Sequence, residues 1–168
     1  IAVFGSAVAG SEAAYQLSKR GFRVVVFDQG ILPYGKIEDG LPLWQWKLRN
    51  KEEQNIDHKL DQPNILFVPG VKLGRDLGFQ EVIDWGFTAI ILATGGDAQL
   101  FRDNVHPPCV TGDSYAAGFR AGAELMNLEF MQIFFSTVYP TRNLFHVRHK
   151  KVFENMYNVE HHHFLVDY

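Results

Sequence analysis

The first ten residues combine glycines and small side chains at a spacing that can bind a diphosphate. Residues 1–4 form an apolar strand that leads directly into Gly5, and a helical pattern follows over residues 11–20. One glycine allows a tight turn out of the strand, and a second lets the helix pack closely on the sheet. Backbone N–H groups and the helix dipole then favour an anion at this corner. The residues expected to hold the pyrophosphate of a dinucleotide are Gly5, Ser6, Ala7, Ala9 and Gly10.

An acidic residue follows at the distance that a dinucleotide site requires. Residues 23–27 form a second apolar strand that ends at Asp28, about 20 residues beyond the glycine turn. A carboxylate at this position accepts a hydrogen bond from a ribose 2′-hydroxyl, so Asp28 is expected to hold the adenosine ribose. Ala7 departs from the pattern, because it replaces the middle glycine of G-x-G-x-x-G, where the backbone comes closest to phosphate. Its methyl group is tolerable if the φ angle of Ala7 stays negative.

Alternating strands and helices predict the framework that positions this corner. A Gly- and Pro-rich loop over residues 29–43 precedes a polar helix over residues 44–60, whose expected buried side chains are Trp44, Trp46, Leu48, Ile56 and Leu60. Strands are expected over residues 64–68 and 88–93, with a short helix over residues 79–85; the second strand is apolar throughout and therefore expected to be central. A loop over 97–110, a small-residue helix over 111–126 and an extended segment over 127–133 follow. The pattern predicts an α/β fold with a Rossmann-like, doubly wound, mainly parallel sheet, as an incomplete domain.

The glycine corner, Asp28 and the strand end Ala93-Thr94-Gly95 together resemble the FAD-binding domain of the glutathione-reductase-like flavoproteins. Within residues 1–95, two segments are similar to the branch of the glutamate synthase small subunit and adrenodoxin reductase. They are residues 32–42, with Leu-Pro-Tyr-Gly and a later Leu-Pro, and residues 71–76, Val-Lys-Leu-Gly-Arg-Asp. The resemblance implies FAD as the cofactor, the 33–42 loop near the flavin, the backbone around Leu73 near the adenine, and Thr94 and Gly95 against the cofactor.

Residues 93–132 are similar to a second branch, that of the fumarate reductase, succinate dehydrogenase and L-aspartate oxidase flavoproteins. The similarity rests on the glycines after the strand end, on Thr111-Gly112-Asp113, and on segments 120–124 and 128–132. It implies that the helix begun by Thr111 abuts the flavin, with Gly112 and Asp113 near the flavin end. The substrate-binding histidine of that branch corresponds to Phe134, which cannot donate a hydrogen bond to a dicarboxylate. This replacement argues against succinate or fumarate chemistry.

Composition argues against several other classes of function. The 168 residues carry a net charge of −3 and one cysteine, Cys109, so neither nucleic-acid binding nor an internal disulfide is expected. No apolar stretch approaches the ~18 residues of a membrane span and no signal peptide is visible, which favours a cytoplasmic location. The histidines His146, His149 and 161–163 lack companion ligands at a recognisable spacing, so no metal site is expected.

The sequence leaves three functional hypotheses. The first is the FAD-binding domain, residues 1–140, of a flavin-dependent oxidoreductase that transfers hydride at flavin N5, followed by a tail over residues 141–168. The second is an NAD(P)-binding dehydrogenase module, in which Asp28 would favour NAD over NADP by repelling a 2′-phosphate. The third is a non-catalytic fragment that keeps the fold without the cofactor, which Ala7 and Phe134 favour.

The first hypothesis does not make the chain a complete catalyst. No second glycine-rich turn follows a strand, so NAD(P)H as electron donor would bind elsewhere, and no catalytic residue stands out. The chain begins inside a strand without an initiator methionine, which favours a piece of a longer protein with further domains or subunits.

Overall fold

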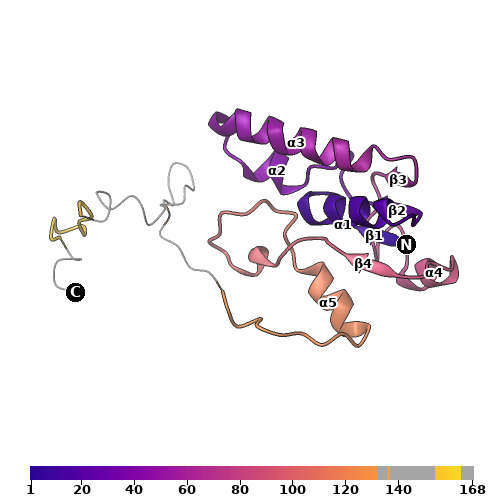
Figure 1. Ribbon diagram of the computed structural model, residues 1–168. Coiled ribbons are helices and arrows are strands. Elements are labelled where there is room, and N and C mark those ends of the chain that lie inside the picture. Colours follow the sequence, from indigo (N-terminus) through magenta and orange to yellow (C-terminus); the bar gives the residue numbers. More distant parts are fainter. Residues whose placement is uncertain (132–135, 137–153, 164–168) are drawn as a thin grey trace. The chain divides into compact units, whose positions relative to one another are not determined.

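The computed structural model describes residues 1–131, 136 and 154–163 of the chain (Figure 1). Contacts divide the chain into two compact units, one containing residues 1–102 and 106–125 and the other residues 103–105 and 126–168. All the described helices and strands belong to the first unit. The fold of this unit therefore decides where the candidate site residues lie.

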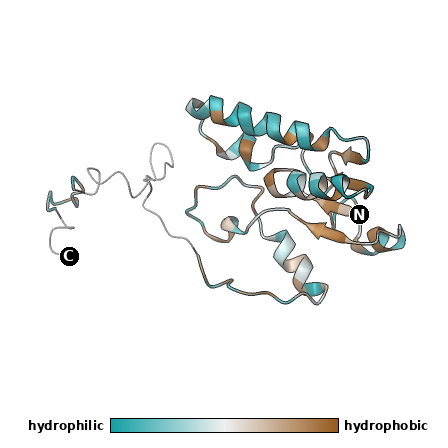
Figure 2. Ribbon diagram, viewed as in Figure 1, coloured by the Kyte–Doolittle hydropathy of each residue, from teal (hydrophilic) through white to brown (hydrophobic). Residues whose placement is uncertain are grey.

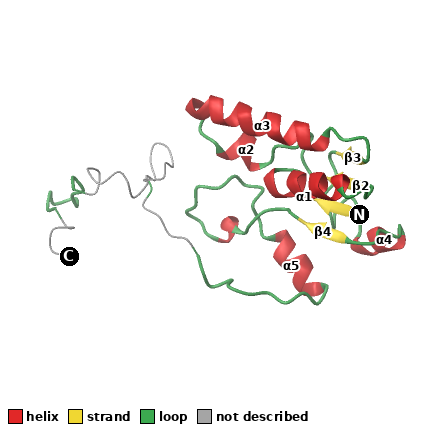
Figure 3. Ribbon diagram, in the orientation of Figure 1, coloured by secondary structure: helices red, strands yellow, loops and turns green. Residues whose placement is uncertain are grey.

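A parallel sheet of four strands, in the order β3-β2-β1-β4, forms the centre of the first unit (Figure 3). The strands are β1 (Ala2–Phe4), β2 (Val24–Phe27), β3 (Ile65–Val68) and β4 (Ile90–Leu92). Because every pairing is parallel, the carboxyl ends of the strands meet at one end of the sheet, where open α/β sheets bind their ligands. The predicted α/β, Rossmann-like fold with a mainly parallel sheet is confirmed.

Helices connect the strands and cover the sheet. The helices are α1 (Val8–Lys19), α2 (Lys36–Gly40), α3 (Trp46–Leu60), α4 (Phe79–Asp84) and α5 (Asp113–Arg120), with 3-10 turns at Leu43–Gln45 and Ala98–Leu100. Helices α1 and α3 pack side by side (Figure 1), and β1, α1 and β2 form the expected βαβ unit. The short helix α2 lies inside the segment that was expected to be a loop.

The core has two parts, one on each face of the sheet. On the face of α1, Val3 and Val26 pack with Ala14 of that helix. On the other face, Phe4 stacks on Phe27 with ring centroids 5.0 Å apart, and Val82 of α4 joins them. Successive residues of a strand point to opposite faces, so each short strand supplies both cores. Figure 2 accordingly shows the strands as hydrophobic along their length.

The burial expected for residues 44–60 is largely wrong. Ile56 is 1% exposed, but Trp44 and Trp46 are 67% and 56% exposed, and Leu48 is exposed as well. The cause lies in what the first turns of α3 face. They meet the short helix α2 through an ion pair between Arg49 and Glu38 (3.7 Å) and only the later turns reach the core beside α1.

Strand β4 is an outer strand of the described sheet and not the central strand that its apolar sequence predicted. Its apolar character has a different cause, because both of its faces are covered. Ile90 and Leu92 pack on the core beside α4, whereas Ile91 packs on the core beside α1. A run of apolar residues therefore indicates a strand that is covered on both faces of the sheet. It does not by itself indicate that another strand pairs with it on each side.

The expectations for residues 111–126 and 127–133 also need correction. Helix α5 stops at Arg120 and does not continue to residue 126, because Gly122 takes a φ of +83° and Ala123 N–H bonds back to Gly118 O at 2.9 Å. Residues 127–131 contain a turn closed by Phe130 N–H on Asn127 O (3.1 Å) in place of an extended segment. Residues 132 and 133 lie outside the described residues.

Candidate dinucleotide site

The strand-to-helix corner requires glycine at two positions. Gly5 has a φ of +96°, and a Cβ atom built on it would lie 2.3 Å from the carbonyl oxygen of Ala93. A Cβ on Gly10 would lie 1.7 Å from the carbonyl oxygen of Gly5. Both close contacts involve backbone atoms, which cannot rotate away. The corner is therefore pressed between the start of α1 and the end of β4, and only glycine fits there.

The start of α1 has the properties of an anion site. Its first turn holds no acidic residue and no side chain caps it. Val8 is 46% exposed and Ala9 is exposed, so the end of the helix that carries the N–H groups is open. Glu12 points elsewhere, since its carboxylate pairs with Lys59 of α3 at 2.9 Å. The open N–H groups and the positive end of the helix dipole favour a phosphate at this corner.

Ala7 meets the condition that its methyl group imposes. Its φ is −67°, an ordinary value for a residue with a Cβ atom. The methyl group lies close to the following loop, because a Cβ on Gly35 would approach the Cβ of Ala7 to 3.1 Å. The loop over residues 29–43 thus passes next to the glycine corner, and Gly35 leaves room for Ala7.

The carboxylate of Asp28 is held by the corner itself. Its Oδ2 accepts hydrogen bonds from Ser6 N–H (2.8 Å) and from the Ser6 hydroxyl (2.5 Å), and its Oδ1 accepts one from Gly30 N–H (2.8 Å). A carboxylate offers about four acceptor positions, so roughly one remains for a ribose hydroxyl. Ser6 is fully buried, which makes this contact part of the core of the corner.

Backbone bonds attach the loop after β3 to the same carboxylate-bearing residue. Val71 N–H donates to Asp28 O at 2.8 Å, and Gly70 N–H donates to Gly30 O at 3.0 Å. Leu73, expected near an adenine, forms a bridge with Leu77 inside this loop. The end of β2, the glycine corner and the loop after β3 are therefore one connected structure built around Asp28.

The end of β4 and the start of α5 form the other side of the corner. Gly112 N–H bonds to Gly96 O at 3.0 Å, and the hydroxyls of Thr94 and Ser114 contact each other. Gly112 has a φ of +80°, and a Cβ on it would lie 2.8 Å from the Cβ of Asp97. Gly95 also has a positive φ, +91°, in the turn between these elements.

Asp113, the first residue of α5, carries a paired carboxylate. Its Oδ2 contacts Lys72 Nζ at 2.9 Å and accepts a hydrogen bond from the Thr111 hydroxyl, also at 2.9 Å. Lys72, followed by Thr111, holds the pKa of Asp113 below its usual range. Asp113 is therefore ionised near neutral pH, and its charge is balanced by Lys72.

Asp76 organises the loop that carries Lys72. Its carboxylate accepts a hydrogen bond from Lys72 N–H at 2.9 Å and pairs with Arg75 at 2.6 Å. Arg75, followed by the Lys72 amide, lowers the pKa of Asp76. The loop thus keeps the backbone of Lys72 in one place by its own contacts.

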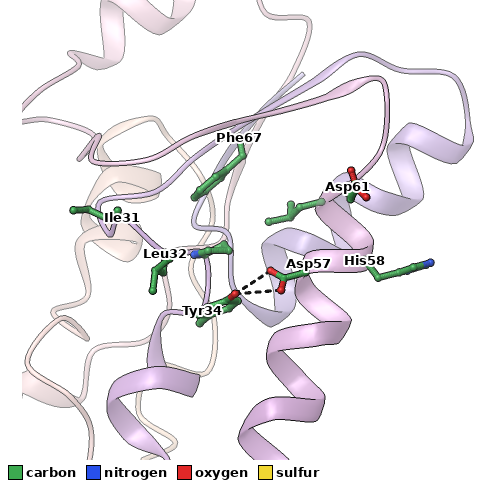
Figure 4. Close-up of a pocket in the computed structure, with 9 residues that line it drawn as sticks. Ile31, Leu32, Tyr34, Asp57, His58, Asp61 and Phe67 are labelled. Atoms are coloured by element: carbon green, nitrogen blue, oxygen red, sulfur yellow. Dashed lines mark hydrogen bonds between the residues drawn. The ribbon is translucent and has the colours of Figure 1, made fainter.

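A separate hollow of about 520 Å³ opens between the 31–34 segment and the end of α3 (Figure 4). Of the segments expected near the cofactor, only the 33–42 loop reaches it, through Pro33 and Tyr34. Tyr34 donates a hydrogen bond to the Asp57 carboxylate at 3.1 Å, while His58 points away from this pair. Burial, followed by Asp57, raises the pKa of Tyr34. Asp57 and His58 are both exposed, so nothing here assembles an acid–base pair.

The remaining candidates of the sequence show no further site. Burial raises the pKa of the Cys109 thiol, which keeps it protonated near neutral pH. No group of three or more potential metal ligands is found among the described residues, and His146, His149 and Phe134 lie outside them. Within residues 1–131, none of the helices combines the length and the apolar character needed to span a membrane.

Comparisons with known proteins find the chain similar to two groups of relatives, although no protein-family model matches it. An L-aspartate oxidase from Nostoc sp. is 45% identical over 60 residues, which are 35% of this chain and 10% of that protein. The NADPH glutamate synthase small chain of Mycobacterium tuberculosis is 36% identical over 101 residues, which are 58% of this chain and 20% of that protein. These are the two FAD-flavoprotein branches that the motifs resemble. Both resemblances are confirmed.

Among solved structures, FprA from Mycobacterium tuberculosis superposes with a TM-score of 0.53 and 21% identity, over 58% of this chain and 22% of that chain. This likeness shows a shared fold. The second FprA structure, described as a Mycobacterium tuberculosis oxidoreductase, gives the same TM-score. The chain spans 10% and 20% of the length of the two curated relatives and less than a quarter of FprA.

The sequence does not predict the role of Lys72 as the partner of Asp113. Lys72 was noticed only as part of the segment next to Leu73, and its partner Asp113 lies far along the chain. The pairing of Lys72 with Asp113 arises because the chain segments after β3 and β4 meet in space. The spacing of residues within either segment does not predict it. An acid at the start of a helix is stabilised by the helix dipole without a cation, so the sequence carries no signal for this partner.

Proposed function

We propose that this chain supplies the FAD-binding region of a flavin-dependent oxidoreductase, with residues 1–140 as the cofactor domain and residues 141–168 as a tail. The observation that carries the proposal is the glycine corner, in which Gly5 and Gly10 leave no space for a Cβ atom beneath an uncapped helix start. A corner that tolerates only glycine, next to open N–H groups, suits a bound diphosphate. The two flavoprotein relatives support FAD as the dinucleotide.

Each residue has a role in this proposal. The amides from Ser6 to Gly10 hold the diphosphate, and the remaining acceptor position of Asp28 takes a hydroxyl of the adenosine ribose. The backbone at Leu73 borders the adenine. Thr94, Gly95, Gly112 and Asp113 border the rest of the cofactor, where FAD supplies hydride transfer at N5 when bound. The protein contributes binding, orientation and charge.

The hydride donor and acceptor belong to the same proposal. NAD(P)H as an electron donor would bind to another domain or subunit, because the described sheet offers one glycine corner. In this proposal the substrate of the whole protein also binds to another domain or subunit. A cytoplasmic location and the lack of a metal site stay predictions.

Titration of the purified full chain with FAD tests the proposal, with flavin fluorescence as the readout. FAD should bind, ADP-ribose should compete because it shares the diphosphate and the adenosine, and FMN should compete poorly because it lacks both. NAD in place of FAD tests the alternative of a dehydrogenase module. Tight binding of NAD with none of FAD would favour that alternative, and binding of neither would favour a fragment that has lost its cofactor.

Two variants locate the bound dinucleotide. Asp28→Asn should weaken FAD and ADP-ribose about tenfold, since a hydrogen bond to a charged group contributes about 1.5 kcal/mol or more. Asp61→Asn makes the same change of charge at an exposed residue of the separate hollow and should leave both affinities unchanged. Urea unfolding of both variants checks that the fold is kept. Equal affinities for Asp28→Asn and the wild type would contradict the proposed site.

A further inference from the structure

The ion pair between Lys72 and Asp113 connects the two outer sides of the candidate site. Lys72 follows β3 and Asp113 follows β4, and these are the outer strands of the described sheet, with β2 and β1 between them. Lys72 Nζ and Asp113 Oδ2 are 2.9 Å apart. The pair is therefore made by loops that leave the carboxyl ends of strands separated by two others, and it crosses the end of the sheet where ligands bind.

Both partners are held in place by other contacts. The amide of Lys72 donates to Asp76, and the preceding residue, Val71, donates to Asp28 O. Asp113 also accepts the Thr111 hydroxyl, and its neighbours Gly112 and Ser114 contact Gly96 and Thr94. The lysine is about one-third exposed and the aspartate about one-half. The backbone on each side of the pair is thus held by contacts other than the ion pair itself.

The charges of Lys72 and Asp113 matter for an anionic ligand. A dinucleotide diphosphate is an anion, and an ionised carboxylate at the start of α5 would repel it within the ~8–10 Å over which charges act at ordinary salt. Lys72 makes the pair neutral as a whole. It engages Oδ2, together with Thr111, and no described contact engages Oδ1. Asp113 therefore keeps one acceptor oxygen for a neutral hydroxyl group.

We propose that Lys72 is a positioning residue for the cofactor site, which holds Asp113 and neutralises it so that an anionic dinucleotide can bind beside α5. This inference rests on the proposed function. Lys72 acts through Asp113 and does not itself touch the reacting part of the cofactor. Its effect is on affinity for the diphosphate-containing ligand.

The test is FAD titration of the full chain carrying Lys72→Met, Asp113→Asn or both. Lys72→Met should weaken FAD about fivefold, because pairs at this exposure contribute up to about 1 kcal/mol. Lys72→Arg keeps the charge and should restore the affinity. Once Asp113 is asparagine, Lys72→Met should have no further effect, and high salt should reduce the loss seen in the single variant.

Controls separate this effect from general charge and from folding. Lys47→Met removes one positive charge from the exposed side of α3, where Lys47 lies over the ring of Trp46, and should not alter FAD affinity. Urea unfolding of Lys72→Met checks its fold. The inference is overturned if Lys72→Met binds FAD as tightly as the wild type, or if its loss persists at high salt or with Asp113→Asn. A wild-type chain that binds no FAD refutes the proposed function, and this inference with it.

Discussion

Alanine at Gly5 should destabilise the fold far more than alanine at another glycine of the same backbone conformation. Gly5 and Gly21 have φ values of +96° and +84°. A Cβ on Gly5 would meet the Ala93 carbonyl oxygen at 2.3 Å, whereas a Cβ on Gly21 would meet nothing within 4 Å. The two substitutions therefore share the cost of the backbone conformation, and only Gly5→Ala adds a clash with β4.

The expected magnitudes follow from these two costs. A positive φ costs about 1–2 kcal/mol for a residue with a Cβ atom, and a core clash adds about 1–3 kcal/mol. Gly5→Ala should thus lower the free energy of unfolding by about 2–5 kcal/mol, and Gly21→Ala by about 1–2 kcal/mol. These figures leave out the restriction that alanine places on the unfolded chain, which reduces each loss by about 0.4–1 kcal/mol and cancels in the comparison.

Gly10→Ala isolates the clash, because Gly10 has no positive φ and its Cβ would lie 1.7 Å from Gly5 O. Its loss should reach or exceed about 3 kcal/mol, since backbone atoms cannot yield as side chains do. Urea unfolding followed by far-ultraviolet circular dichroism measures all three variants. Tryptophan fluorescence is less suitable, because Trp44, Trp46 and Trp85 are all exposed in the native state. Equal losses for Gly5→Ala and Gly21→Ala would refute the claim that β4 presses on the corner.

Three further predictions concern the corner, the core and the acid response. Ser6→Ala removes the hydroxyl that donates a hydrogen bond to Asp28 and should lower the free energy of unfolding in urea by about 1.5–3 kcal/mol. An unchanged free energy of unfolding would contradict this hydrogen bond. Ile56→Ala should cost about 2–5 kcal/mol by the same measurement, whereas Leu48→Ala on the same helix should cost about 0.5 kcal/mol or less; equal losses would contradict the observed burial. Because the folded pKa of Asp113 is depressed, its stabilising contribution is complete above its ordinary value of 3.8 and disappears as the pH falls through the lower folded value. The stability difference between wild type and Asp113→Asn should therefore be constant near neutral pH and vanish in acid, and a difference that grows in acid would contradict the ion pair.

Some elements could be predicted because their causes are local. The turn at Gly5, the helix after it and the strand that ends at Asp28 follow from residue type and spacing within a few turns of chain. The strand expected over residues 64–68 and the helix expected over residues 79–85 are found at Ile65–Val68 and Phe79–Asp84 for the same reason. Each of these patterns is complete within its own segment.

Other features could not be predicted because they depend on neighbours in space. The same kind of apolar residue is buried at Ile56 and exposed at Leu48 on one helix. Helix α3 packs against both α1 and α2, and its own sequence does not say which of its turns will be covered. Strand β4 reads as a central strand but lies at the side of the described sheet. The sequence pattern does not say which element will cover a side chain. The predictions for the burial within α3 and for the place of β4 in the sheet were therefore wrong.

The sequence by itself determined that a glycine corner joins a strand to a helix and that an acid ends the next strand, because backbone conformation and short spacing decide these features. Only the tertiary structure decided how the corner is held. The Ala93 carbonyl lies close against Gly5, the Ser6 hydroxyl donates to the Asp28 carboxylate, and Lys72 forms an ion pair with Asp113. These contacts join residues from separate segments, and their distances are set by the packing of the parallel sheet, which no single stretch of sequence contains.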